Sequence, residues 1–451
     1  MTVLIHSGLI SFLLVAIYLL LIPIGGARSA QAAVMLAPAQ SMVATSNPSR
    51  SETYPDTQAA IQVWQQRIQR SPRSYLSYLQ LGQAYLRRAR ETGDVSYYVK
   101  AEAAVRQAAD INPRYPNIQP LLAQILYSLH EFKEALAIAQ SLEDSGSQRA
   151  LATLGDVYQA LGRYQEAETT YQTLAQMKES ASLYSRQAAL KEATGDFDQA
   201  LHLMEKATAS AYSEGYYGES LAWHEFQLGE LYWKAARFTA SETHFKKALA
   251  IYPDYYLALA GLGRIAAARG QSNLAIDYLT QATDQIPQPD LLATLGDLFA
   301  IRGQEEQAEK YYSTVEFIGH LAKINQQVYN RQLVMFYADH DRNVDQAVTL
   351  AERELQDRQD LLGWDAAAWA YFKHGQLDLA QAAMEHALEL HPHNAMIYYH
   401  AGLIARDHGQ SQLAQQQLAH ALDLHPAFDP LQAPRAQQAL KALQSEEEAE
   451  S

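Results

Sequence analysis

The sequence contains no cysteine. Disulfide bonds, thiolate nucleophiles, cysteine-ligated zinc and a lipid-modified N-terminal cysteine are therefore excluded. The absence of cysteine does not by itself identify the compartment in which the chain works.

Basic residues are in the minority, with 35 Lys and Arg against 50 Asp and Glu, a formal net charge of −15 at pH 7. Binding to nucleic acid or to an anionic membrane surface needs clusters of Lys and Arg, and none stands out in the sequence. We therefore expect neither partner, and we read most of the acidic charge as a solvated surface.

Motifs for catalysis are also lacking. Gly261-x-Gly263 follows no strand, so helix packing explains it better than a phosphate-binding loop. His224-Glu225 has no second histidine four residues on, as a zinc protease would require. No serine lies in a nucleophile elbow, and no stretch has the pattern of a strand. The sequence predicts a non-enzymatic protein without a cofactor.

A repeat of 34 residues is present instead. Residues 361–394 and 395–428 agree at 13 of 34 positions, and both copies end in Leu-His-Pro. Such a period, with small residues inside two apolar-periodic segments and a closing proline, indicates a helix-turn-helix solenoid. Gly402 falls in the middle of a predicted helix, where glycine costs about 1 kcal/mol relative to alanine. We expect it to permit a close approach of the next helix, near Ala414 and Ala421.

These residues resemble the tetratricopeptide repeat pattern, and similar units extend back to Thr57. The resemblance implies an all-α fold, a right-handed superhelical solenoid of about ten helix-turn-helix repeats with a C-terminal capping helix. Val315–Gln326 departs from the period, which predicts either a longer helix or a kink. We divide the chain into a leader (1–32), a flexible linker (33–56), N-terminal repeats (57–314), a connector (315–326), C-terminal repeats (327–432), a capping helix (433–444) and a disordered acidic tail (445–451).

The leader contains an uncharged, mostly apolar run from Leu9 to Ile24, followed by Ala30-x-Ala32. Small residues at this spacing predict signal-peptide cleavage after Ala32. Two alternatives stay open: Val3–Ile24 is long enough to span a bilayer as an uncleaved anchor, or it forms a buried core helix. Both a cleaved signal peptide and an uncleaved anchor predict that the repeats lie outside the cytoplasm, either secreted, periplasmic or anchored facing out.

The tetratricopeptide resemblance also implies where a partner binds. The first helix of each unit would line a concave groove, where aromatic anchors and charged side chains hold a peptide or protein segment. The residues at these family positions are Trp223, Phe226, Glu230, Trp233, Lys234, Arg264, Arg331, Asp365, Trp369, Phe372, Lys373, Tyr399 and Arg406. For Trp223 and Trp233, packing between neighbouring repeats is an equally good interpretation.

Eight of the fifteen histidines fall between His374 and His425. Duplication of the 34-residue unit explains most of this enrichment. The alternative is a metal-handling accessory protein, since imidazole binds zinc, copper and nickel. Its candidate ligands are His386, His391, His393, His420 and His425.

The C-terminal half resembles a group of exported bacterial tetratricopeptide proteins of unassigned role. The match rests on Tyr329-Asn330-Arg331, Ala338-Asp339-His340, the segment Trp364–Ala370, Tyr399-His400-Ala401-Gly402 and Ala427-Phe428-Asp429-Pro430. Some members are encoded near transporters that resemble nickel carriers, which favours the metal alternative. Our first prediction remains a scaffold that binds a protein or peptide.

Overall fold

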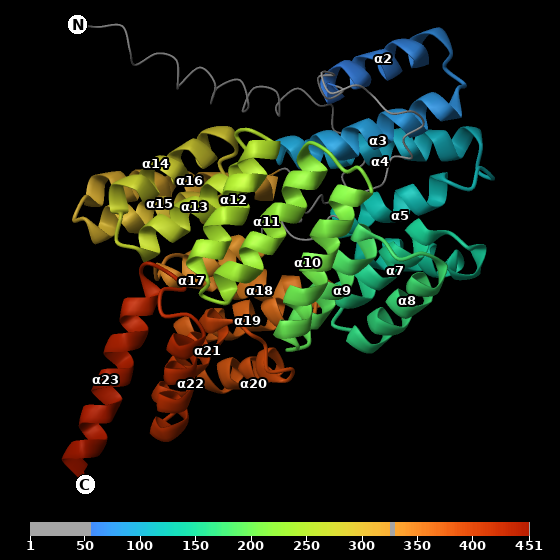
Figure 1. The fold of residues 1–451 in the computed structure, drawn as a ribbon. Helices are drawn as coiled ribbons and strands as arrows, with labels where there is room; N and C mark the ends of the chain where they lie inside the picture. Colours follow the sequence, from blue (N-terminus) through green and yellow to red (C-terminus); the bar gives the residue numbers. More distant parts are fainter. Residues whose placement is uncertain (1–55, 325–329, 451) are drawn as a thin grey trace, which may run out of the picture.

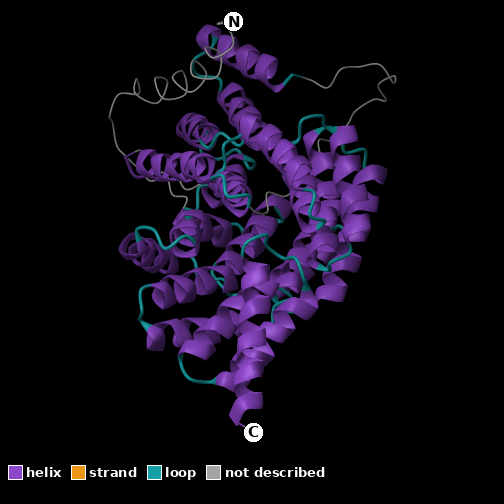
Figure 2. Cartoon of the chain, turned by 90° about the vertical axis from the view of Figure 1, so that its left-hand side faces the viewer, coloured by secondary structure: helices purple, strands orange, loops and turns teal. Residues whose placement is uncertain are grey.

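The structure is a computed structural model that describes residues 56–324 and 330–450, with the side chains of 322–324, 330 and 448–450 left aside. The predicted leader and nearly all of the linker lie outside the described residues. Within them the chain is helical throughout, without a strand (Figure 2). No helix in this part of the chain is both long and apolar enough to cross a membrane.

Ten pairs of antiparallel helices follow one another, as the repeat predicted, and the architecture is a right-handed superhelical solenoid. The pairs are α3 (Tyr75–Thr92) with α4 (Ser96–Ile111), α5 (Ile118–Ser128) with α6 (Phe132–Ser141), α7 (Gln148–Ala160) with α8 (Tyr164–Met177), α9 (Ala181–Ala193) with α10 (Phe197–Ser213), α11 (Glu219–Lys234) with α12 (Phe238–Ile251), α13 (Tyr256–Ala268) with α14 (Ser272–Gln285), α15 (Pro289–Ile301) with α16 (Glu305–Ile324), α17 (Asn330–Asp339) with α18 (Val344–Asp357), α19 (Leu361–Lys373) with α20 (Leu377–Leu388), and α21 (Ala395–Asp407) with α22 (Ser411–Leu424).

A single helix flanks the pairs at each end. Helix α2 (Thr57–Arg70) packs on α3, and α23 (Gln432–Glu450) packs on α22 and extends from the lower end of the molecule (Figure 1). Helix α23 caps the last repeat as expected, but its helical backbone includes residues 445–450, for which we predicted disorder. Residues 315–324 likewise continue α16, so the described part of the connector is a longer helix.

Close packing inside a pair explains the glycine in the middle of α21. A Cβ atom at Gly402 would stand 2.6 Å from Cγ of Leu418 on α22, closer than side chains tolerate. Leu418, Ala414 and Ala421 are fully buried along this contact. Because Gly402 has no side chain, α21 and α22 can pack closely at this point. The gain in dispersion energy offsets the poor helix propensity of glycine.

The ribbon of helix pairs also packs against itself. Segments from opposite halves of the chain contact each other. The turn between α7 and α8 contacts the loop before α19: the backbone N–H of Leu361 donates to the Tyr164 hydroxyl at 3.2 Å. A Cβ atom at Gly162 would stand 2.6 Å from the carbonyl oxygen of Gln359.

The same kind of contact recurs along the ribbon. The turn after α3 meets the loop before α15 through Gly93 and Ile286. The turn after α9 meets the loop before α21, where the rings of Phe197 and His393 stack with centroids 3.9 Å apart. The turn after α11 meets the loop after α22 through Trp233 and His425.

Lys133 and Asp357, at the start of α6 and the end of α18, complete the series with an ion pair of 3.2 Å. The turns of the first five helix pairs therefore contact segments of the last five. We call this set of contacts the seam, comprising Gly93, Lys133, Gly162, Tyr164, Phe197 and Trp233 on one side and Ile286, Asp357, Gln359, Leu361, His393 and His425 on the other.

Candidate functional site

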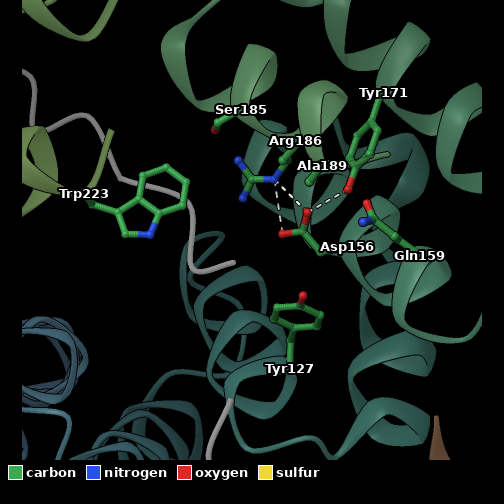
Figure 3. A pocket seen from close by; sticks show the side chains of 8 residues that line it. All are labelled: Tyr127, Asp156, Gln159, Tyr171, Ser185, Arg186, Ala189 and Trp223. Atoms are coloured by element: carbon green, nitrogen blue, oxygen red, sulfur yellow. Dashed lines mark hydrogen bonds and ion pairs between the residues drawn. The ribbon is translucent and has the colours of Figure 1, made fainter. Parts of the chain in front are cut away.

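The first polar cluster of the interior is a buried ion pair between neighbouring repeats. Nε of Arg186 on α9 donates to the two carboxylate oxygens of Asp156 on α7, at 2.8 and 3.1 Å. The hydroxyl of Tyr171 donates to the same carboxylate at 2.8 Å (Figure 3). The surrounding cavity, which Tyr127 and Trp223 also line, measures only about 10 Å³. It has room for about one water molecule, so this cluster is structural.

A second cluster lies beside the seam, within the C-terminal half of the ribbon. Asp360 caps the N-terminus of α19 by accepting from the backbone N–H of Gly363 at 2.8 Å. Arg358 binds its carboxylate at 2.6 Å, and Nη1 of Arg331 lies 3.6 Å away. Burial alone would raise the pKa of Asp360, but the two guanidinium groups overcome that effect and hold it below its usual value. Arg331, one of the predicted groove residues, therefore has a partner within the chain.

The predicted aromatic groove residues are largely inside the protein. Trp369 is 2% exposed, and its Nε1 donates to Asp339 at 2.9 Å; the hydroxyl of Tyr399 donates to Gln432 at 2.8 Å. Trp223, Phe226 and Trp233 are also buried, and Phe372 is half-buried against Trp369. The chain's own packing already uses these side chains, whose predicted role in partner binding stays a prediction.

The charged groove residues are all engaged in ion pairs or hydrogen bonds with other residues of the chain. Asp365 binds the buried imidazole of His400 at 2.8 Å. Lys373 pairs with Asp341 at 2.6 Å, and Arg406 pairs with its neighbour Asp407 at 2.7 Å. The remaining pairs are Lys234 with Glu192 and Arg264 with Glu230. Of the charged groove residues, only Arg406 is classed as exposed.

One cavity brings two predicted groove residues together with a segment that the sequence did not single out. Trp233 on α11 and Arg264 on α13 face the loop between α22 and α23, with room of about 210 Å³ between them. We call it the loop cavity, and its lining is Trp233, Arg264, Ala267, Ala268, Thr294, Pro426, Ala427, Phe428, Asp429, Pro430, Ala433, Pro434 and Gln437. Prolines at 426, 430 and 434 were visible in the sequence as a signal of a rigid loop.

The walls of the loop cavity are mostly apolar, with one cation and one carboxyl group. The guanidinium carbon of Arg264 lies 5.4 Å from the centroid of the Trp233 ring. The carboxylate of Asp429, which also lines the cavity, accepts from the backbone N–H groups of Leu431 and Gln432, both at 2.8 Å, just before and at the start of helix α23. The cavity can hold one long side chain of a partner, with a polar group at each side to orient it.

Two further carboxylates lie behind Asp429. Asp297 on α15 binds His340 at 2.7 Å and accepts from the Tyr312 hydroxyl at 2.8 Å, and Asp339 on α17 accepts from Trp369 and Gln432. Burial raises the pKa of Asp429 to about 7, and repulsion from Asp297 and Asp339 adds to the rise, while the two backbone N–H groups oppose it. The inner end of the loop cavity is therefore rich in negative charge.

Four of the five histidines of the metal alternative are packed against aromatic rings. His386 stacks on Trp364, His393 on Phe197, and His420 and His425 contact Tyr398 and Trp233. His391 lies in the turn before α21 with a positive φ of 49°. Across the described ranges, no group of three or more His, Cys, Asp or Glu residues is arranged to hold a metal ion. The structure gives the metal alternative no ligand cluster.

Comparison with known families bears on the fold. Three family models, each described as a tetratricopeptide repeat, match this chain: one over residues 179–254, one over 226–289 and 366–427, and one over 150–183. No curated protein matches the chain.

Solved structures resemble the chain in fold only. The human IFIT1 dimer with PPP-AAAA is 18% identical, with 70% of this chain and 72% of that chain covered and a TM-score of 0.47. Yeast Tom70 is 13% identical, with 86% and 93% covered and a TM-score of 0.36. A tetratricopeptide repeat protein from Parabacteroides merdae is 13% identical, with 59% and 100% covered and a TM-score of 0.33.

Proposed function

Because the chain is a tetratricopeptide repeat protein, we propose that it is a non-enzymatic scaffold that binds a peptide or protein segment. Solenoids of this kind suit protein–protein interaction, since stacked helix pairs present long surfaces for an extended partner. The observation that carries the proposal is the loop cavity, where Trp233 and Arg264 line a space that the chain leaves open.

Packing within the chain limits which of the predicted groove residues a partner can contact. Inner residues such as Trp369 and Tyr399 are packed against neighbouring helices and would have to leave the core to meet a partner. Trp233 is buried as well, but together with the half-buried Arg264 it lines the loop cavity beside the α22–α23 loop. We therefore place the binding of the partner at the loop cavity rather than along the whole inner surface.

A cavity-filling variant tests this proposal. Ala268 is half-buried and lines the loop cavity, so Ala268→Trp fills it, whereas Ala382→Trp places the same side chain on the exposed surface of α20. Peptides selected from a random displayed library on the wild-type chain should bind Ala268→Trp at least tenfold more weakly and bind Ala382→Trp normally. Equal binding to both folded variants would contradict the location, and failure to select any peptide would contradict the function.

We further propose that the repeats work outside the cytoplasm. The support is the apolar run Leu9–Ile24 with Ala30-x-Ala32 in the sequence. The test is mass spectrometry of the protein from fractionated cells that express it naturally. A mature N-terminus at Ala33 would mean cleavage, and an intact Met1 in the membrane fraction would mean an uncleaved anchor. An intact N-terminus in the soluble cytoplasm would overturn the proposal.

A further inference from the structure

The loop cavity has the dimensions of a single side chain. Its volume of about 210 Å³ is too small for a folded element, and its mouth opens beside the loop that joins α22 to α23. Two aromatic residues line it, Trp233 from α11 and Phe428 from the loop. Aromatic rings attract a cation that passes over them.

The charge around the cavity is not balanced. Arg264 is paired with Glu230, so its positive charge is already compensated. Asp429 accepts hydrogen bonds from two backbone N–H groups and has no cationic side chain bound to it among the described contacts. Behind it, Asp297 binds the imidazole of His340, and the imidazoles of His400 and His340 both act on Asp339. The inner end of the cavity thus has more carboxylates than bound cations.

The groups that face this region come from several helices. Asp297 lies on α15, Asp339 and His340 on α17, Arg264 on α13 and Arg435 on α23, while His400 on α21 acts on Asp339. Burial lowers the pKa of His340, but the adjacent Asp297 and Asp339 overcome that effect and raise it above the usual value. The three carboxylates of Asp297, Asp339 and Asp429 therefore outnumber the two imidazoles of His340 and His400, and His400 is also bound to Asp365.

Building on the proposed function, we propose that the loop cavity takes an arginine or lysine side chain of the partner, with Asp429 as its counter-charge. The aliphatic part of such a side chain would lie against Ala267, Ala268 and Pro430, and its cationic end would reach the carboxylate. Pairing would recover part of the free energy that the uncompensated carboxylate costs.

An acidic side chain fits the same space less well. Its carboxylate could bind Arg264 only in competition with Glu230, and it would stand opposite Asp429. Like charges at such a site cost several kcal/mol in a desolvated interface. Charge complementarity therefore favours the cation.

The experiment uses small probes with the full chain. Binding of N-acetyl-arginine amide, its neutral isostere N-acetyl-citrulline amide and N-acetyl-glutamate amide is measured by ligand-observed NMR. We expect the arginine probe to bind at least tenfold more tightly than the other two. Its affinity should rise about tenfold between pH 6 and pH 8, as Asp429 with a pKa of about 7 loses its proton.

Asp429→Asn is the decisive variant, because asparagine retains the cap of α23 while removing the charge. This variant should bind the arginine probe at least tenfold more weakly than the wild type, and the affinity should no longer depend on pH. Asp423→Asn, on the exposed surface of α22, is the matched control and should leave both unchanged.

Each other result overturns the inference. Equal binding of the arginine and citrulline probes would mean that the cavity takes an uncharged side chain. Preferred binding of the glutamate probe that is lost in Arg264→Met would mean that it takes an acidic side chain. No binding of any probe would mean that the cavity is not a binding site. If selected peptides depend on Ala268 but contain no enriched basic residue, the scaffold function stands and only this inference fails.

Discussion

The imidazole ring of His425 lies 4.4 Å from the indole of Trp233, measured between ring centroids, and both side chains are buried. His425 follows the last repeat, whereas Trp233 ends the first helix of the fifth pair. This contact fixes the end of the ribbon on its middle. A partner must therefore bind a ribbon that already contacts itself.

The seam should weaken in acid. Burial lowers the pKa of His425 to about 4, with positive charge at Arg264 and His393 adding to the shift, and burial also lowers the pKa of His393. A depressed pKa means that the folded state prefers neutral imidazoles, so their contribution to stability is present above about pH 6.5 and is lost as pH falls toward 4.

Urea unfolding at pH 7.5 and pH 5.0 measures this effect. The free energy of unfolding of the wild type should fall as the pH falls over this range. The fall should exceed that of His393→Gln/His425→Gln by on the order of 1 kcal/mol per pH unit. His202→Gln, at an exposed position, should behave as the wild type. An identical loss in all three proteins would show that the seam histidines do not titrate with unfolding.

A thiol cross-link should close across the seam. Because the chain has no cysteine, Lys133→Cys/Asp357→Cys provides its only two thiols, at positions whose native side chains approach within 3.2 Å. A short bismaleimide should join them within one molecule in high yield. Lys133→Cys/Asp423→Cys, which pairs α6 with the distant α22, is the control. Similar yields from both pairs would contradict a ribbon closed on itself.

Replacing Trp369 tests whether it belongs to the core. Trp369→Ala removes a side chain that is 2% exposed and deprives Asp339 of a donor. We expect a loss of about 3–5 kcal/mol in the free energy of unfolding. Phe317→Ala, at a ring that is 49% exposed, should cost less than about 0.5 kcal/mol. Loss of peptide binding at Trp369→Ala without loss of stability would instead restore the predicted groove role.

A methyl group at Gly402 should separate α21 from α22. Gly402→Ala places Cβ against Leu418, so we expect a cost of about 1–3 kcal/mol despite the better helix propensity of alanine. The double variant Gly402→Ala/Leu418→Ala should be more stable than the sum of the single effects, by at least about 0.5 kcal/mol. Strict additivity in urea unfolding would show that the two residues do not touch.

Removing one partner of the buried pair Asp156–Arg186 should lower the free energy of unfolding more than replacing both partners with apolar residues. Arg186→Met leaves the carboxylate of Asp156 without its partner, which should cost about 3–5 kcal/mol. Asp156→Leu/Arg186→Met removes both charges and should recover most of that loss. Thermal unfolding compares them, and equal destabilisation of the two variants would mean that packing, not charge, sets the cost.

Local features of the sequence predicted the helix pairs. The period of 34, the glycines at the turns and the small residue at Gly402 act within one repeat, so their effect could be worked out from neighbouring residues. The capping role of α23 followed from the same pattern. Its extension through residues 445–450 did not, because a tail with four glutamates among seven residues indicates solvation without fixing the backbone.

The candidate site could be predicted only in part. Trp233 and Arg264 were identified from their positions in the repeat, but the loop that completes their cavity comes from the far end of the chain. Such contacts depend on the curvature that accumulates over many repeats, and no single repeat encodes that curvature.

The register of the seam restricts how a chain of this kind can grow. A unit inserted between α12 and α13 would move every later loop onto a turn with the wrong side chains, so that Gln359 would no longer meet Gly162, which makes room for it. A unit appended beyond α22 would leave the earlier contacts in place. The copies 361–394 and 395–428, which agree at 13 of 34 positions, stand at that end, where a further unit would disturb the fewest contacts.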